Sequence, residues 1–97
     1  MRQKLGVVQR CILYVLAEQD RLIDTIELTA LAFDVHSNDA GQYLVNDAQV
    51  VSVRRALRKL SRAGKVVDLG REWRDGRRRW ATPAAAERYY QVRAARY

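Results

Sequence analysis

Arginine and lysine side chains are concentrated in two short segments whose chemistry could bind a polyanion. The first segment is VVSVRRALRKLSR, residues 50–62, and the second is REWRDGRRR, residues 71–79. A guanidinium group forms paired hydrogen bonds with phosphate oxygens, and an ammonium group binds them as a point charge. The two segments therefore indicate a surface that recognises phosphates or other clustered anions.

The net charge of +7 is unevenly divided along the chain. Residues 1–47 hold 4 Lys and Arg against 7 Asp and Glu, giving −3, whereas residues 48–97 hold 14 against 4, giving +10. Such asymmetry favours a nucleic acid as the partner, with anionic lipid as a weaker alternative. A basic surface that is simply solvated is the third interpretation.

Length and composition limit the class of protein. The 97 residues are expected to form a single domain over residues 1–97, and no stretch approaches the roughly 20 apolar residues of a membrane span. Cys11 is the only cysteine, which agrees with a reducing cytoplasm. Gln9 and Arg10 interrupt the apolar run that a signal peptide would need, so we expect a cytoplasmic protein with no membrane partner.

Signatures of catalysis are absent from the sequence. It has no glycine-rich phosphate loop and no nucleophile with a paired histidine. His36 and Asp39 are too few ligands for a metal site. We therefore expect no enzyme activity and no cofactor.

The first basic segment belongs to an amphipathic helix expected over residues 47–63. Its inner side has apolar residues at helical spacing, namely Val50, Val53, Ala56, Leu57 and Leu60. Its outer side is mostly basic and contains Val51, Ser52, Arg55, Arg58, Lys59 and Arg62, with Arg54 at the margin. Asn46 or Asp47 can cap its start, with Gln49 at capping-box spacing, and Gly64 can end it in a left-handed conformation.

Two further helices are expected before this one. The first covers residues 5–18 and has a wide apolar stripe formed by Leu5, Val7, Val8, Cys11, Ile12, Tyr14, Val15 and Leu16. After a turn at residues 20–23, the second covers residues 24–35, with Asp24 and Glu27 at capping-box spacing and an inner stripe of Leu28, Leu31, Ala32 and Val35. Residues 36–46 read as a loop held in place by Tyr43, Leu44 and Val45.

The second basic segment lies in a hairpin expected over residues 65–82. Asp75-Gly76 predicts a two-residue type I′ turn, which places Arg74 opposite Arg77, Trp73 opposite Arg78 and Arg71 opposite Trp80. Trp73 and Trp80 would then share one face with Leu69 and pack on the helices, with Arg71 and Arg78 over the indole rings. Thr82-Pro83 reads as the N-cap and first residue of a last helix over residues 83–97.

This order of helix, helix, helix, hairpin and helix resembles the winged helix-turn-helix family. The fold class implied is mainly α with a β-hairpin: three helices, a two-stranded wing and a C-terminal helix. In residues 50–67, VVSVRRALRKLSRAGKVV looks like the family's recognition helix and its exit through glycine. In residues 76–83, GRRRWATP looks like the second wing strand and the entry to the last helix. The chain is also similar to small winged-helix proteins of actinobacteria and their phages. The connection over residues 36–46 is longer than the tight turn of a basic helix-turn-helix.

The resemblance implies a helix in the DNA major groove and a wing on the minor groove or backbone. Base contacts are then expected from Val51, Ser52 and Arg55. Backbone contacts are expected from Arg58, Lys59, Arg62, Arg74, Arg77, Arg78 and Arg79.

The leading hypothesis is a sequence-specific double-stranded DNA-binding protein that regulates transcription. An accessory or architectural role in recombination, replication or plasmid and phage maintenance is the first alternative. A winged helix that binds protein or RNA is the second. A homodimer through residues 83–97 and the first helix would let two copies read two half-sites.

Overall fold

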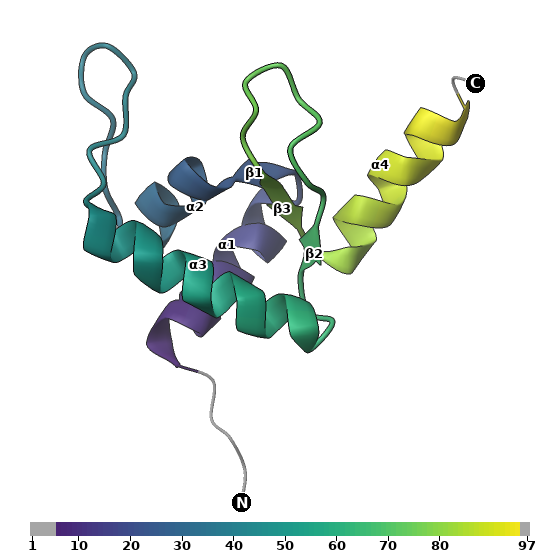
Figure 1. Cartoon of the computed structure of the whole chain (residues 1–97), viewed down its shortest axis with the longest axis horizontal. Coiled ribbons are helices and arrows are strands. Elements are labelled where there is room, and N and C mark those ends of the chain that lie inside the picture. The colour runs from purple at the N-terminus through teal and green to yellow at the C-terminus, as the bar shows by residue number, and fades with distance from the viewer. Residues whose placement is uncertain (1–5, 96–97) are drawn as a thin grey trace, which may run out of the picture.

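A computed structural model describes residues 6–95 of the chain (Figure 1). Its elements are α1 (Val7–Gln19), β1 (Ile23–Asp24), α2 (Thr25–Ala32), α3 (Asp47–Arg62), β2 (Val67–Asp68), β3 (Arg79–Ala81) and α4 (Pro83–Ala95). The strands form an antiparallel sheet in the order β1-β3-β2. The fold is therefore mainly helical with a small sheet. Leu5 of the expected first helix and residues 96–97 of the expected last helix lie outside the described residues.

Local signals in the sequence determine both ends of α3. The Asn46 side chain accepts a hydrogen bond from the Gln49 amide at 2.8 Å, and the Gln49 side chain accepts one from the Asn46 amide at 3.0 Å. Gly64 takes a left-handed φ of 74°, and the Lys65 amide then donates to the Leu60 carbonyl. The predicted capping box and glycine stop of this helix are both confirmed.

Helix α2 is shorter than the expected span of residues 24–35. Asp24 caps its start as predicted, because the carboxylate accepts the Glu27 amide at 2.8 Å. Its end comes at Ala32, where Asp34 takes a left-handed φ of 55° and the Val35 amide donates to the Ala30 carbonyl. Asp34 thus takes the left-handed conformation that glycine usually takes after the end of a helix. The sequence pattern alone does not predict this helix end.

The main core lies where α1, α2 and α3 pack on one another. Leu16, Leu28 and Leu57 contribute one fully buried side chain from each helix, and the inner side of α3 is buried at Val53, Ala56, Leu57 and Leu60. Val50 is only partly buried. Three expected packing residues are wrong, because Val7, Tyr14 and Leu44 are each about two-thirds exposed, at 66%, 68% and 67%. Val7 and Tyr14 lie on the side of α1 away from the core, and Leu44 points outward from its loop.

Strand β1 falls where the sequence predicted only a turn. Ile23 pairs with Trp80 and Asp24 with Arg79. Ile23 and Trp80 are both buried, and the Trp80 indole donates to the Thr25 hydroxyl at 2.9 Å. A strand of two residues is too short for its alternation to be visible, so only this pairing across the chain defines it.

The predicted hairpin register is wrong by three residues. Val67 pairs with Ala81 and Asp68 with Trp80, so Arg71 does not lie opposite Trp80. The tip turns over Trp73–Gly76, where the Gly76 amide donates to the Trp73 carbonyl at 2.9 Å. A type I′ turn needs positive φ at Asp75, and among the described non-glycine residues only Asp20 and Asp34 have it.

The altered register also separates the two tryptophans. Trp80 belongs to the main core, whereas Trp73 packs against a second cluster that contains Leu69 and Tyr89. Arg79, not Arg71 or Arg78, is the guanidinium recorded over the Trp73 ring, at 5.2 Å. The expectation of one shared aromatic face was therefore wrong.

Helix α4 packs on the hairpin. The Thr82 hydroxyl accepts the Ala85 amide at 3.1 Å, which confirms the predicted cap, and Ala85 and Ala86 are buried against Leu69 and Ala81. Arg88 pairs with Asp20 at 2.5 Å, and Arg93 pairs with Glu72 at 2.8 Å. Beyond these contacts α4 extends away from the other helices (Figure 1).

Truncating Leu57 should destabilise the protein, because its fully buried side chain belongs to the core cluster that α1, α2 and α3 share. We expect Leu57→Ala to lower the free energy of unfolding by about 2–5 kcal/mol in urea titrations. The matched change Leu44→Ala, at a residue that is 67% exposed, should alter it by less than about 0.5 kcal/mol. Equal losses in the two variants would contradict this assignment of the core.

Candidate nucleic-acid interface

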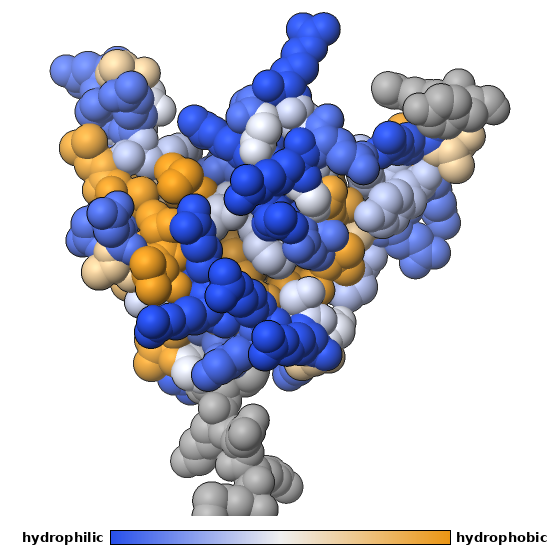
Figure 2. Space-filling view, in the orientation of Figure 1, coloured by the Kyte–Doolittle hydropathy of each residue, from blue (hydrophilic) through white to orange (hydrophobic). Residues whose placement is uncertain are grey.

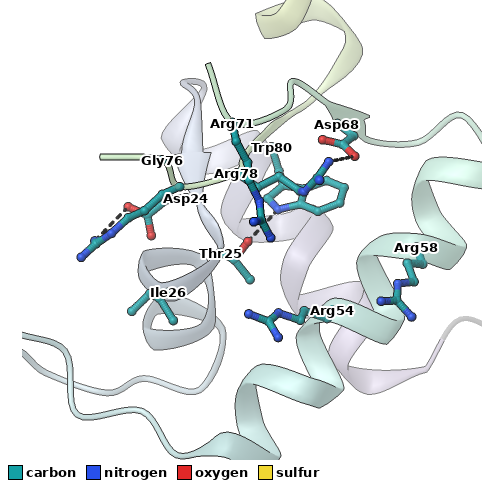
Figure 3. Close-up of a pocket in the computed structure, with 11 residues that line it drawn as sticks. Asp24, Thr25, Ile26, Arg54, Arg58, Asp68, Arg71, Gly76, Arg78 and Trp80 are labelled. Atoms are coloured by element: carbon teal, nitrogen blue, oxygen red, sulfur yellow. Dashed lines mark hydrogen bonds and ion pairs between the residues drawn. The ribbon is translucent and has the colours of Figure 1, made fainter. Parts of the chain in front are cut away.

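An open groove of about 580 Å³ runs between the start of α2, the exposed side of α3 and the hairpin (Figure 3). Five arginines and two aspartates line it, and Trp80 closes it on the core side. The groove residues with charge are Asp24, Arg54, Arg58, Asp68, Arg71, Arg77 and Arg78. Segments far apart in sequence therefore bring five cations and two anions together, an excess of three positive charges.

The arginines enter the groove from two sides. Arg54 and Arg58 are one helical turn apart on α3, and Figure 3 shows both side chains on the side that faces the hairpin. Arg71 and Arg78 come from the opposite side, beside the Trp80 ring (Figure 3). An anion in the groove would therefore meet guanidinium groups from the helix and from the hairpin together.

Two of the five arginines already have carboxylate partners. Arg78 binds Asp68 at 2.5 Å, and Arg77 lies 3.7 Å from Asp24. Within residues 6–95, the guanidinium groups of Arg54, Arg58 and Arg71 have no hydrogen-bond or ion-pair partner. These three arginines supply the uncompensated charge of the groove.

The structure divides the expected base-reading residues. Val51 is 42% exposed and Arg55 is exposed, both on the outer side of α3. Ser52 is half-buried. Because Ser52 and Arg54 are two residues apart on a helix, they project about 160° apart, so Ser52 lies away from the groove.

The expected backbone-contacting residues also separate into groups. Arg58 lines the groove, whereas Lys59 and Arg62 are exposed on α3 outside its lining. In the hairpin, Arg74 and Arg77 are exposed. Arg78 and Arg79 are half-buried and held by internal carboxylates, Asp68 and Asp75 respectively.

Some groove residues were not found by reasoning from sequence. Arg54 lies at the margin between the apolar and the basic side of α3, so helical spacing alone does not assign it a role. The hairpin beside α3 makes Arg54 a residue of the groove. Asp24 was read only as a helix cap, yet it also approaches Arg77. That contact depends on the pairing of β1 with β3, for which the sequence carries no signal.

Comparison of the chain with protein-family models and with curated proteins gave no match. No helix among the described residues is long and apolar enough to cross a membrane. In the same part of the chain, no group of three or more His, Cys, Asp or Glu side chains is placed to hold a metal ion.

The hairpin tip should weaken in acid through Asp75. A hydrogen bond from the Arg79 guanidinium, and a second from the Arg77 amide, lower the pKa of the Asp75 carboxyl below its ordinary value of 3.8. Since the folded pKa lies below the unfolded one, this stabilisation is complete above 3.8 and is lost as the pH falls through the lower value.

We therefore expect Asp75→Asn to reduce the acid dependence of the unfolding free energy, measured in urea between about pH 5 and pH 2. Asp39→Asn is the control, because Asp39 is exposed and has no ion pair within the described chain. If both variants keep the acid dependence of the parent protein, the interaction of Asp75 with Arg79 does not contribute to it.

Proposed function

We propose that this protein binds double-stranded DNA sequence-specifically as a winged helix-turn-helix and regulates transcription. The observation that carries the proposal is the groove in which Arg54, Arg58 and Arg71 have no partner within residues 6–95. Unpaired guanidinium groups on two sides of an open groove match a phosphate backbone, whose charges repeat along each strand.

The shape of the interface supports DNA over a small anion. Helix α3 has 16 residues and packs on α1 and α2 with one side, which leaves its other side exposed along its length. The major groove is about 12 Å wide and admits one α-helix. With α3 in that groove, the adjacent hairpin meets the neighbouring backbone or minor groove.

The position of each of the following basic residues of α3 and the hairpin supports a role in binding DNA. Arg55 lies on the outer side of the second and third turns of α3, where a guanidinium can bond guanine O6 and N7 together. Arg58, Lys59 and Arg62 lie further along the helix and meet phosphates. Arg71, Arg74 and Arg77 add phosphate contacts from the hairpin. Arg78 and Arg79 join only if phosphate replaces their carboxylate partners.

Removing the three unpaired groove arginines should flatten the salt dependence of DNA binding. With Arg54, Arg58 and Arg71 all replaced by alanine, the slope of log K against log salt should fall by about 2.7, because each lost phosphate contact contributes about 0.9. The slope is measured by fluorescence anisotropy on a labelled duplex over a series of salt concentrations.

Arg10→Ala is the matched control, since Arg10 is exposed on α1 and does not line the groove. A triple variant with the slope of the parent protein would remove the groove from the interface.

Selection of bound duplexes from a random pool at two salt concentrations separates a sequence-specific protein from a general polyanion binder. Bent DNA at recombination or replication sites would indicate the architectural role, and binding to RNA or protein without duplex binding would indicate the other alternative.

We also propose that two copies associate through α4. Beside this helix lies an apolar groove of about 380 Å³ whose walls include Val67, Ala86, Tyr90 and Ala94. Tyr90 is 49% exposed at its edge. A second α4 related by a two-fold axis would place the same residues against this groove, as an isologous interface requires. Helix α1 is joined to α4 through Asp20 and Arg88 and does not form the wall of this groove.

Tyr90→Ser should shift the protein from dimer to monomer, because it removes the exposed aromatic ring that lines the apolar groove. Light scattering at several protein concentrations measures the change in mass. Val92→Ser is the control, since Val92 is exposed on a different side of α4. If the parent protein is a monomer at all concentrations, or if the two variants behave alike, this surface is excluded.

A further inference from the structure

The exposed side of α3 is divided between two kinds of chemistry. Residues 22–53 contain no lysine or arginine and five acidic residues, whereas residues 54–62 contain five basic residues and no acidic one. Figure 2, coloured by hydropathy, shows hydrophobic side chains gathered over α2 and the start of α3 and hydrophilic ones over the other half of α3. The two halves of the helix therefore cannot face the same part of a DNA duplex.

The first two turns of α3 present one carboxylate and small apolar groups. Asp47 and Ala48 are exposed, and Val51 is 42% exposed one turn later. Asp47 has no ion pair within the described residues. The capping box between Asn46 and Gln49 occupies the Gln49 amide and side chain, which leaves the backbone amides of Asp47 and Ala48 at this end. No side chain on this half of the helix is cationic, and the Asp47 carboxylate beside the two amides repels a phosphate.

Repulsion decides what this half can face. A carboxylate near a phosphate is repelled by it. An apolar side chain against a phosphate removes water from the phosphate oxygens and offers them no hydrogen bond in return. Base edges in the major groove offer the complementary groups. Thymine presents its C5-methyl group to apolar side chains, and cytosine presents its N4 amino group to a carboxylate.

We propose that the first two turns of α3 recognise pyrimidine edges, with Val51 and Ala48 on a thymine methyl group and Asp47 accepting from a cytosine amino group. This inference rests on the proposed DNA binding and adds the class of bases that the site takes. Phosphates are bound only by the half of α3 that begins at Arg54 and by the hairpin. The phosphate contacts of α3 therefore all lie in its second half. The DNA site that is recognised has pyrimidines next to the guanine that Arg55 contacts.

Deoxyuridine provides the sharpest test, because it differs from thymidine only by the missing methyl group. In the preferred duplex, obtained by selection from a random pool, each thymidine is replaced in turn and the Kd is measured by anisotropy. We expect one position at which the Kd rises about fourfold, the equivalent of about 0.8 kcal/mol for one buried methyl group. In Val51→Ser the same replacement should have a clearly smaller effect at that position, because only Ala48 then remains to contact the methyl group.

Val92→Ser on α4 is the control, and it should keep the full response to deoxyuridine, because Val92 is equally apolar but lies outside the interface. Urea unfolding of each variant confirms that the fold is retained. Asp47→Asn should leave the salt slope unchanged and weaken the preference for cytosine. Tighter binding of Asp47→Asn to every duplex would instead place Asp47 beside a phosphate and overturn the inference.

The outcomes separate this inference from the function on which it rests. If no duplex is bound at low salt, DNA binding itself fails and the inference fails with it. If a preferred site is found but no thymidine in it responds to loss of its methyl group, DNA binding stands and recognition of pyrimidines by α3 is wrong.

Discussion

The central strand β3 is the constraint on which the rest of the arrangement depends. It pairs with β1 on one side and β2 on the other, and its Trp80 is buried in the core of the three helices. The Trp80 indole donates to the Thr25 hydroxyl, so its polar atom is satisfied inside the protein. Because the same strand belongs to the core and to the hairpin, it fixes where the hairpin lies relative to α3.

The charged groove is a consequence of that fixed position. Pairing of β1 with β3 brings Asp24 near Arg77, and pairing of β2 with β3 places Asp68 where Arg78 can bind it. The tip is held separately, since Arg79 binds Asp75 and covers the Trp73 ring, which packs on Tyr89 of α4. Helix α4 thereby supports the side of the hairpin that faces away from α3.

Features determined by neighbouring residues could be predicted from the sequence, and those determined by distant pairing could not. The caps at Asn46 and Thr82 and the glycine stop at Gly64 depend on hydrogen bonds within a few residues, so their sequence patterns are sufficient. The register of the hairpin was wrong because burial of Trp80 overrides the local preference of Asp75-Gly76 for a tight turn. The basic side of α3 follows from helical spacing within one segment and could be predicted. The groove between Arg54 and Arg71 depends on where the hairpin lies relative to α3 and could not.

Under the proposed DNA binding, the two ion pairs of the groove would exchange their carboxylates for phosphates. Exposed pairs contribute only about 0–1 kcal/mol, and the Arg78 and Asp68 side chains are 38% and 35% exposed. Losing such a pair costs the fold little, while the freed guanidinium can bind a phosphate through two hydrogen bonds. Asp24 differs, because its other oxygen caps α2 and its side chain is only 14% exposed. Arg77 can therefore leave Asp24 for a phosphate while the cap of α2 remains, so the guanidinium groups already in the groove become available without any change in the helices that position them.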